Sequence, residues 1–235
     1  VISGNYENKY FRNVKGKKLA TMWGYVSDGV WKSWELADAP AGTEAGSYKF
    51  KDIDGVEGIT EDDQTAIGNG QPSFQWGWNN TLTYKNFDFN IFFNGMLGKD
   101  LNVQSWKSWT DIYALGTSGE NYGVRMLDAW TPTNTDTTIP ALSTNNNNDE
   151  GRMSTYYVES GSYLKIRNAE IGYTIPDSFA KSLKIQKARI ALRADNIATI
   201  KKTWGDNAFT GLDPETPGST YPLPFSMTMS INLTF

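Results

Sequence analysis

The chain has 235 residues, a formal net charge of −4, and neither cysteine nor histidine. The absence of these two residue types excludes thiolate or imidazole zinc sites, structural disulfides and Ser-His-Asp or cysteine nucleophiles. The acidic balance gives no basic footprint, which excludes nucleic acid as an expected partner. Aromatic residues make up 14% of the chain, and no apolar run approaches the ~18 residues of a membrane-spanning helix, so we expect strands and tight turns.

The first strongly patterned segment is Phe74–Tyr84, in which apolar or aromatic residues alternate with polar ones. A second alternating run starts at Phe87, directly after Lys85 and Asn86, and is interrupted by Phe92. Two such runs around a two-residue link predict a β-hairpin. At about 3.3 Å per residue and a tilt of about 40°, the first strand would rise roughly 25 Å, the height of the apolar band of an outer-membrane barrel.

Two further strands are expected later in the chain. Residues Tyr163–Ile175 carry apolar side chains first at even and then at odd positions, and a switch near Asn168 predicts a β-bulge. Residues Ala188–Asp195 alternate regularly, with charged side chains opposite the apolar ones. The link Pro176–Ile185 between them is short and has room for one helical turn.

The last ten residues, Ser226–Phe235, alternate polar and apolar without an error and end on an aromatic residue. One face of such a strand suits lipid or a core and the other suits water. Bacterial outer-membrane barrels commonly finish on a strand of this kind, so we interpret residues 223–235 as a terminal strand with an outer-membrane insertion signal. The alternative is a half-buried strand of a soluble β-sandwich.

Link lengths support a barrel because short and long connections alternate. In outer-membrane barrels, short periplasmic turns alternate with long extracellular loops. We therefore expect an all-β, antiparallel transmembrane β-barrel with long extracellular loops at 28–73 and 95–162. The chain begins without a methionine, and five to seven strands would leave open edges in the membrane, so residues 1–235 are expected to need further strands.

Alternation assigns the side chains of these strands to two faces. The residues expected to face lipid are Phe74, Trp76, Trp78, Leu82, Tyr84, Met227, Met229, Ile231, Leu233 and Phe235. Those expected to face the lumen are Arg189, Arg193, Asp195, Ser226, Thr228, Ser230, Asn232 and Thr234.

An acidic segment, DIDGVEGITEDD, predicts a metal site. Asp52, Asp54 and Asp63 occupy positions 1, 3 and 12 of an EF-hand-like spacing, and their oxygen ligands suit calcium. Val56 at the fifth position, Glu57 in place of the turn glycine and an aspartate at position 12 depart from that pattern. A solvated acidic turn without a metal is the alternative.

The long loops are rich in aromatic residues, which can stack on sugar rings or contact a lid, or instead bury against a neighbouring loop. The candidates for contact with substrate or lid are Trp106, Trp109, Tyr113, Trp130, Tyr156 and Tyr157.

Several segments, in order, resemble the C-terminal part of the SusC/RagA-like TonB-dependent outer-membrane transporters. They are MWGYVSDGVW (Met22–Trp31), the run from Tyr48 to Gly95, SYLKIRNAEIGYTIP (Ser162–Pro176), DNI (Asp195–Ile197), GLDPE (Gly211–Glu215) and YPLPFSMTMSINLTF (Tyr221–Phe235). The resemblance implies a large plugged barrel in the outer membrane of Gram-negative bacteria. It also implies a SusD-like surface lipoprotein as partner, and contact with TonB through an N-terminal part outside this chain.

The function that follows is import of oligosaccharides or oligopeptides by an outer-membrane active transporter. A soluble carbohydrate-binding β-sandwich module is the alternative. We expect no enzymatic activity, because the adjacent carboxylates of Asp62 and Asp63 are a poor pair for glycoside hydrolysis.

Overall fold

The computed structural model describes residues 11–12, 14–108, 121–142, 151–182, 184–205, 207–218 and 221–235. The chain divides into two compact units, which are described separately. The first comprises residues 1–71, 100–160 and 204–208, and the second residues 72–99, 161–203 and 209–235.

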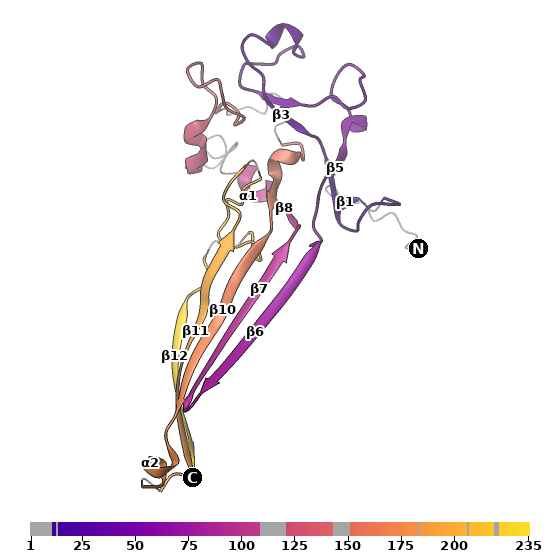
Figure 1. Ribbon diagram of the computed structural model, residues 1–235. Helices are drawn as coiled ribbons and strands as arrows, with labels where there is room; N and C mark the ends of the chain where they lie inside the picture. Colours follow the sequence, from indigo (N-terminus) through magenta and orange to yellow (C-terminus); the bar gives the residue numbers. More distant parts are fainter. Residues whose placement is uncertain are drawn as a thin grey trace. The chain divides into compact units, whose positions relative to one another are not determined.

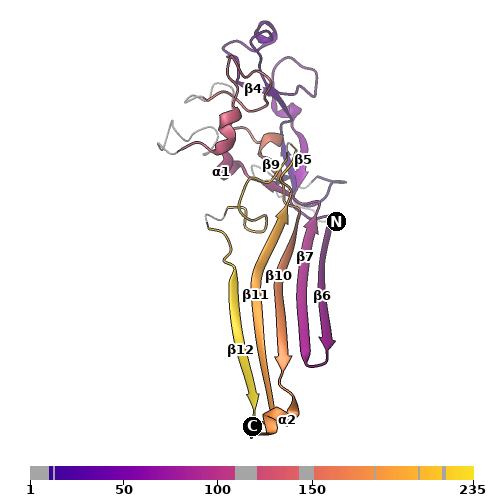
Figure 2. The same cartoon turned by 60° about the vertical axis from the view of Figure 1, so that its left-hand side comes forward.

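The second unit is built on one antiparallel sheet of five strands, in the order β12-β11-β10-β7-β6. Figures 1 and 2 show these strands lying side by side. Their bounds are β6 (Phe74–Tyr84), β7 (Phe87–Leu97), β10 (Tyr163–Thr174), β11 (Lys187–Lys201) and β12 (Ser226–Thr234). The predicted all-β, antiparallel fold class is thus confirmed for this part of the chain.

Strands β6 and β7 form the predicted hairpin, with Tyr84 opposite Phe87 and Lys85 at φ 52° in the two-residue turn. Phe92, which breaks the alternation, lies on the polar face. There its ring packs over Gly77, where an added Cβ would lie 3.3 Å from the ring. The aromatic side chain covers backbone that glycine leaves bare, and this contact accounts for the irregular residue.

The expected bulge in β10 is present, because the register with both β7 and β11 shifts between Ile166 and Asn168. The link after β10 contains the short helix α2 (Asp177–Ser182). Strand β11 runs to Lys201, well past the predicted end at Asp195. Asn196, at φ 53°, lies at the irregularity that hid this continuation.

The first unit consists of short strands and turns around a small core. Met22, Tyr25, Tyr48, Phe50, Met153, Tyr157 and Val158 form this core. Its sheets pair β1 (Phe11–Arg12), β2 (Thr21–Gly24) and β5 (Thr65–Asn69), then β3 (Ser27–Val30) with β4 (Tyr48–Phe50), and β8 (Asp100–Asn102) with β9 (Val158–Ser160). The helices are α1 (Gln104–Ser108) and the 3₁₀ turns Leu36–Asp38, Glu61–Asp63, Val124–Asp128 and Thr155–Tyr157.

The segments expected as loops at 28–73 and 95–162 therefore contain strands, and the first residues of the second segment belong to β7. Short strands with distant partners leave little periodicity in sequence, which explains why they were not anticipated. The extracellular position of both segments stays a prediction. Among the described residues, no helix combines the length and the apolar character needed to cross a membrane.

Candidate functional site

The sheet of the second unit has one apolar face, and strand register explains how it arises. Residues directly opposite each other in antiparallel strands point to the same side. Met229 lies opposite Leu192, Leu192 opposite Ile171, and Ile171 opposite Phe89, which continues the face across four strands to Leu82 on the fifth.

This apolar face is open in the described part of the chain. Met229 is 68% exposed, Leu82 59% and Trp78 56%. Nine of the ten side chains predicted to face lipid are exposed in this way. Trp76 is half-buried because its indole ring lies over Gly95, its partner across the hairpin.

The opposite, polar face carries ion pairs that cross strands. Arg189 on β11 donates from Nε to Asp88 of β7 at 3.0 Å and from Nη2 to Glu170 of β10 at 2.7 Å. On the same face, Arg193 pairs with Asp195, with Nη2 2.8 Å from Oδ1. Three predicted lumen-facing residues of β12 lie opposite these residues in register, with Asn232 across from Arg189, Thr228 from Arg193 and Ser226 from Asp195; the other two, Ser230 and Thr234, lie opposite Ala191 and Lys187. The structure thus groups the predicted residues on one face.

A buried ion cluster, formed by Lys165 and Arg167 of β10 with Asp213 and Glu215, holds a loop to the sheet. Lys165 is only 3% exposed, and its Nζ lies 2.6 Å from Asp213 Oδ2 and 2.7 Å from Glu215 Oε2. Arg167 also pairs with Glu215. Sequence reasoning missed this cluster, although two cations on the polar side of one strand and the acids of the GLDPE segment were available as a signal.

Electrostatics in the ion cluster favour the ionised carboxylate. Burial alone would raise the pKa of Glu215, but hydrogen bonds from Lys165 and Tyr163, together with the charges of Lys165 and Arg167, outweigh burial and hold this pKa below its ordinary value. The loop is therefore fastened by charged groups at neutral pH.

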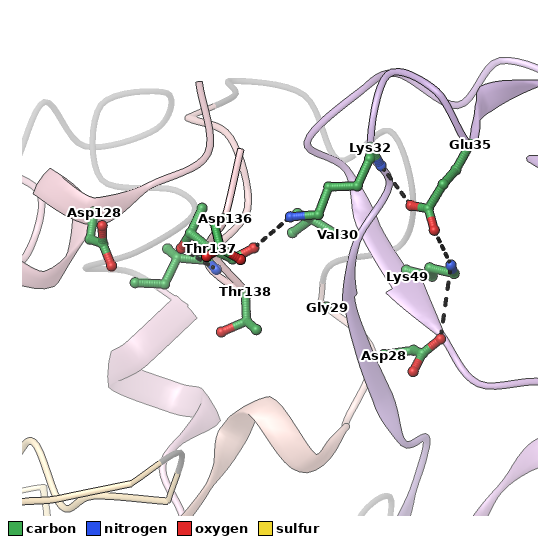
Figure 3. A pocket seen from close by; sticks show the side chains of 11 residues that line it. Asp28, Gly29, Val30, Lys32, Glu35, Lys49, Asp128, Asp136, Thr137 and Thr138 are labelled. Atoms are coloured by element: carbon green, nitrogen blue, oxygen red, sulfur yellow. Dashed lines mark hydrogen bonds and ion pairs between the residues drawn. The ribbon is translucent and has the colours of Figure 1, made fainter. Parts of the chain in front are cut away.

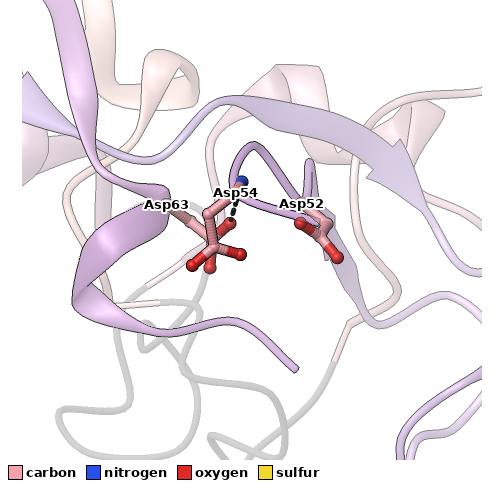
Figure 4. Close-up of side chains that lie close together, drawn as sticks. All are labelled: Asp52, Asp54 and Asp63. Atoms are coloured by element: carbon pink, nitrogen blue, oxygen red, sulfur yellow. Dashed lines mark hydrogen bonds between the residues drawn. The ribbon is translucent and has the colours of Figure 1, made fainter. Parts of the chain in front are cut away.

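The predicted metal-binding aspartates of the first unit do come together. One carboxylate oxygen each from Asp52, Asp54 and Asp63 lies within 4.8 Å of the others (Figure 4). Asp63 is fully buried and accepts hydrogen bonds at 2.8 Å from the backbone N–H groups of Ile53 and Thr60, which lower its pKa. Three converging carboxylates fit a hard cation such as calcium.

The loop aromatics predicted to contact substrate or lid have different surroundings. Tyr157 is 0% exposed inside the core of the first unit, and Trp130 is buried against Gly46, so the structure gives both a packing role. The ring centre of Tyr156 lies 4.2 Å from Lys107 Nζ and 4.7 Å from Arg125 Cζ. Trp109, Tyr113 and the side chain of Trp106 lie outside the described residues.

No protein-family model matches the chain. TonB-dependent receptor P3 of Formosa agariphila is 31% identical over 205 residues, which cover 86% of this chain and 19% of the relative. TonB-dependent receptor P26 of the same organism is 26% identical over 243 residues, covering 95% and 23%. The chain is homologous to the TonB-dependent receptors. The resemblance expected from sequence is thereby confirmed, and the chain spans about a fifth of the length of these relatives.

Solved structures agree with this homology at the level of the fold. The RagAB peptide transporter matches with a TM-score of 0.69 and 23% identity, over 92% of this chain and 22% of that one. The RagAB peptide importer in its open-open state matches with a TM-score of 0.68 and 22% identity. The two relatives are named receptors and the two solved structures a transporter and an importer; none of these names describes an enzyme, as expected for the chain.

Proposed function

We propose that the chain forms part of the wall of a TonB-dependent transporter in the bacterial outer membrane. In this proposal the complete protein imports oligosaccharides or oligopeptides together with a SusD-like surface lipoprotein. Homology to TonB-dependent receptors and a fold shared with a peptide transporter support it.

The single observation that carries the proposal is the two-faced sheet. Its apolar face spans five strands and includes large exposed side chains such as Met229, Ile231 and Trp78. Removing apolar surface from water is favourable by ~25 cal/mol per Å², so an apolar face of this extent requires lipid or protein against it. The polar face, with the Arg189 ion pairs, suits an aqueous passage.

The sheet edges support membrane insertion within a larger barrel. Strands β6 and β12 stand at the two ends of the strand order. An unpaired edge in hydrocarbon would leave backbone N–H and C=O groups unsatisfied, at several kcal/mol each, so both edges call for further strands.

A soluble carbohydrate-binding sandwich would cover the apolar face with a second sheet. Within the described residues, Leu82, Met227 and Met229 remain exposed instead. This exposure favours the membrane proposal over the sandwich.

Uptake by living cells tests the import function. Cells with and without the gene are given defined pools of oligopeptides and oligosaccharides, and depletion from the medium is followed by mass spectrometry. We expect depletion of one pool to require the gene and to stop when TonB is deleted. Equal depletion in both strains would contradict the proposal, and copurification of a surface lipoprotein tests the proposed partner separately.

A further inference from the structure

The first unit contains a cavity of about 440 Å³ between two segments of chain (Figure 3). One wall runs from Asp28 in β3 to Lys32 and includes Glu35 and Lys49 of β4; the other is formed by Asp128 and residues 136–139. Sites for small ligands commonly measure about 300–1,000 Å³, so this cavity has room for a side chain or a short ligand segment.

Both lysines of the cavity are already engaged by the protein. Lys32 Nζ reaches across to the opposite wall and donates to the carbonyl oxygens of Thr135 and Thr137, the latter at 3.1 Å. Lys49 Nζ lies 2.9 Å from Glu35 Oε1 and 4.8 Å from the ring centre of Trp31. The far wall therefore offers oxygen atoms that bind one ammonium group already.

Each carboxylate oxygen of Glu35 already has a hydrogen-bond partner within the protein. The carboxylate accepts a hydrogen bond from the backbone N–H of Lys32 at 2.9 Å as well as from Lys49, and these interactions hold its pKa below the ordinary value. Glu35 thus serves to fix Lys49 and leaves the remaining carboxylates to face the cavity.

Two of those remaining carboxylates, Asp128 and Asp136, lack a close cation. Among the residues that the structure describes, no lysine or arginine nitrogen lies within 4.0 Å of Asp128 or Asp136, and Asp28 is at that limit from Lys49. The neutral Asn134 donates to Asp128 at 3.2 Å without changing its charge. These aspartates also do not converge as Asp52, Asp54 and Asp63 do, so they suit separate organic cations better than one metal ion.

We propose that this cavity binds a ligand bearing ammonium or guanidinium groups, with Asp128 and Asp136 as its ion-pair partners. A lysine side chain of a basic oligopeptide and an amino sugar share this chemistry. The carbonyl groups that hold Lys32 are a precedent within the same wall, and the surplus of carboxylates selects against acidic ligands. The proposal names a substrate class for the importer and in that sense rests on the proposed function.

Calorimetry on the complete protein in detergent tests this site. The probes are tetralysine, the glucosamine tetramer, tetraglutamate and tetraglycine, each at low and at high salt. We expect tetralysine or the glucosamine tetramer to bind, with an affinity that falls as salt rises, and we expect no binding of tetraglutamate or tetraglycine. Whichever cation binds identifies the source of the ammonium group.

The variants Asp128→Asn and Asp136→Asn should each weaken binding of the cationic probe by about tenfold, the typical loss when a charge-assisted contact is removed. The matched control is Asp62→Asn, an exposed aspartate outside the cavity, which should bind as the parent does. Equal binding of tetraglutamate, or unchanged affinity in both cavity variants, would overturn the inference.

Binding and transport are measured separately, so the two proposals fail separately. If the cationic probe binds through Asp128 and Asp136 but no gene-dependent uptake occurs, the import function is contradicted and the site stands. If uptake of a nutrient is intact and no cationic probe binds, the site is contradicted and the import function stands.

Discussion

The guanidinium group of Arg189 lies directly against Gly172 and so reaches Asp88, two strands away in the sheet. A Cβ at position 172 would be 2.6 Å from both Arg189 Cζ and Asp88 Oδ1, closer than real side chains approach. Gly172 lies opposite Asp88 in the register of β10 with β7. Because Gly172 has no side chain, the side chain of Arg189 can cross β10, and its ion pairs therefore link three strands.

Replacing Gly172 by alanine should displace Arg189 and break its pair with Asp88. We expect a destabilisation of about 1–3 kcal/mol, the range for overpacking, measured as a lower urea midpoint for unfolding of the complete protein from lipid vesicles. Gly218→Ala is the matched control, since nothing lies within 4 Å of its added Cβ. Equal midpoints for the two variants would show that the close approach has no energetic role.

The ion cluster should couple the loop to β10. Lys165→Met removes the partner of the buried Asp213, and breaking a buried pair costs ~3–5 kcal/mol. Hydrogen exchange at residues 209–216 should accelerate accordingly, whereas Lys165→Met combined with Asp213→Asn should lose clearly less than the sum of the single variants. Additive losses would contradict a direct interaction.

Acid should release the same loop through Glu215. Its pKa in the folded protein lies below the ordinary 4.5, so the stabilisation it provides is complete above about pH 4.5 and is lost as pH falls through the folded pKa. Proteolysis within residues 209–216 should therefore speed up at low pH in the parent protein, measured with an acid-active protease at low pH and a neutral protease at pH 7, each rate being divided by that for an unstructured peptide. Glu215→Gln should already be cleaved rapidly at neutral pH, and an identical pH profile for parent and variant would refute this linkage.

We further propose that calcium binds at Asp52, Asp54 and Asp63, where the carboxylates converge. Calorimetric titration of the complete protein should give one site with a dissociation constant on the order of 10⁻⁴ to 10⁻³ M, as in extracellular modules. Asp52→Asn combined with Asp54→Asn should abolish the heat, and Asp62→Asn should retain it. Absence of a binding heat in the parent protein would contradict the calcium proposal. The segment would then be an acidic turn held by backbone hydrogen bonds alone.

Periodicity predicted the sheet well because a period of two is a local property of sequence. The hairpin of β6 and β7, the bulge in β10 and the final strand all follow from it, whereas the helix α2 was expected only from the length of its link. The continuation of β11 to Lys201 did not, since Asn196 adopts a positive φ at an irregularity in pairing. The short strands β8 and β9 pair residues such as Leu101 and Glu159, and such distant pairing has no local signature.

The candidate sites also differ in whether their residues are neighbours in sequence or are brought together only by the fold. The aspartates of the acidic segment are near neighbours in sequence, and their convergence was predictable from spacing. The contact of Lys165 with Asp213 depends on how a long connection returns to the sheet, and the cavity near Asp136 depends on two segments about 100 residues apart. In the ion cluster and the cavity, charge and alternation indicate which residues are candidates, but only the fold shows that these residues lie close together.

The most direct test of the two-faced membrane wall is site-specific labelling along β12. These 235 residues contain no cysteine, so single cysteines can be placed at the adjacent residues Thr228 and Met229. Any cysteine elsewhere in the complete protein is first replaced by serine, and the labelled protein is studied in lipid vesicles. We predict that an environment-sensitive probe at Met229 reports hydrocarbon and is quenched by lipid-borne quenchers, while the probe at Thr228 is quenched by water-soluble ones. Equal quenching of both probes from water, or reversal of the pattern, would contradict the account.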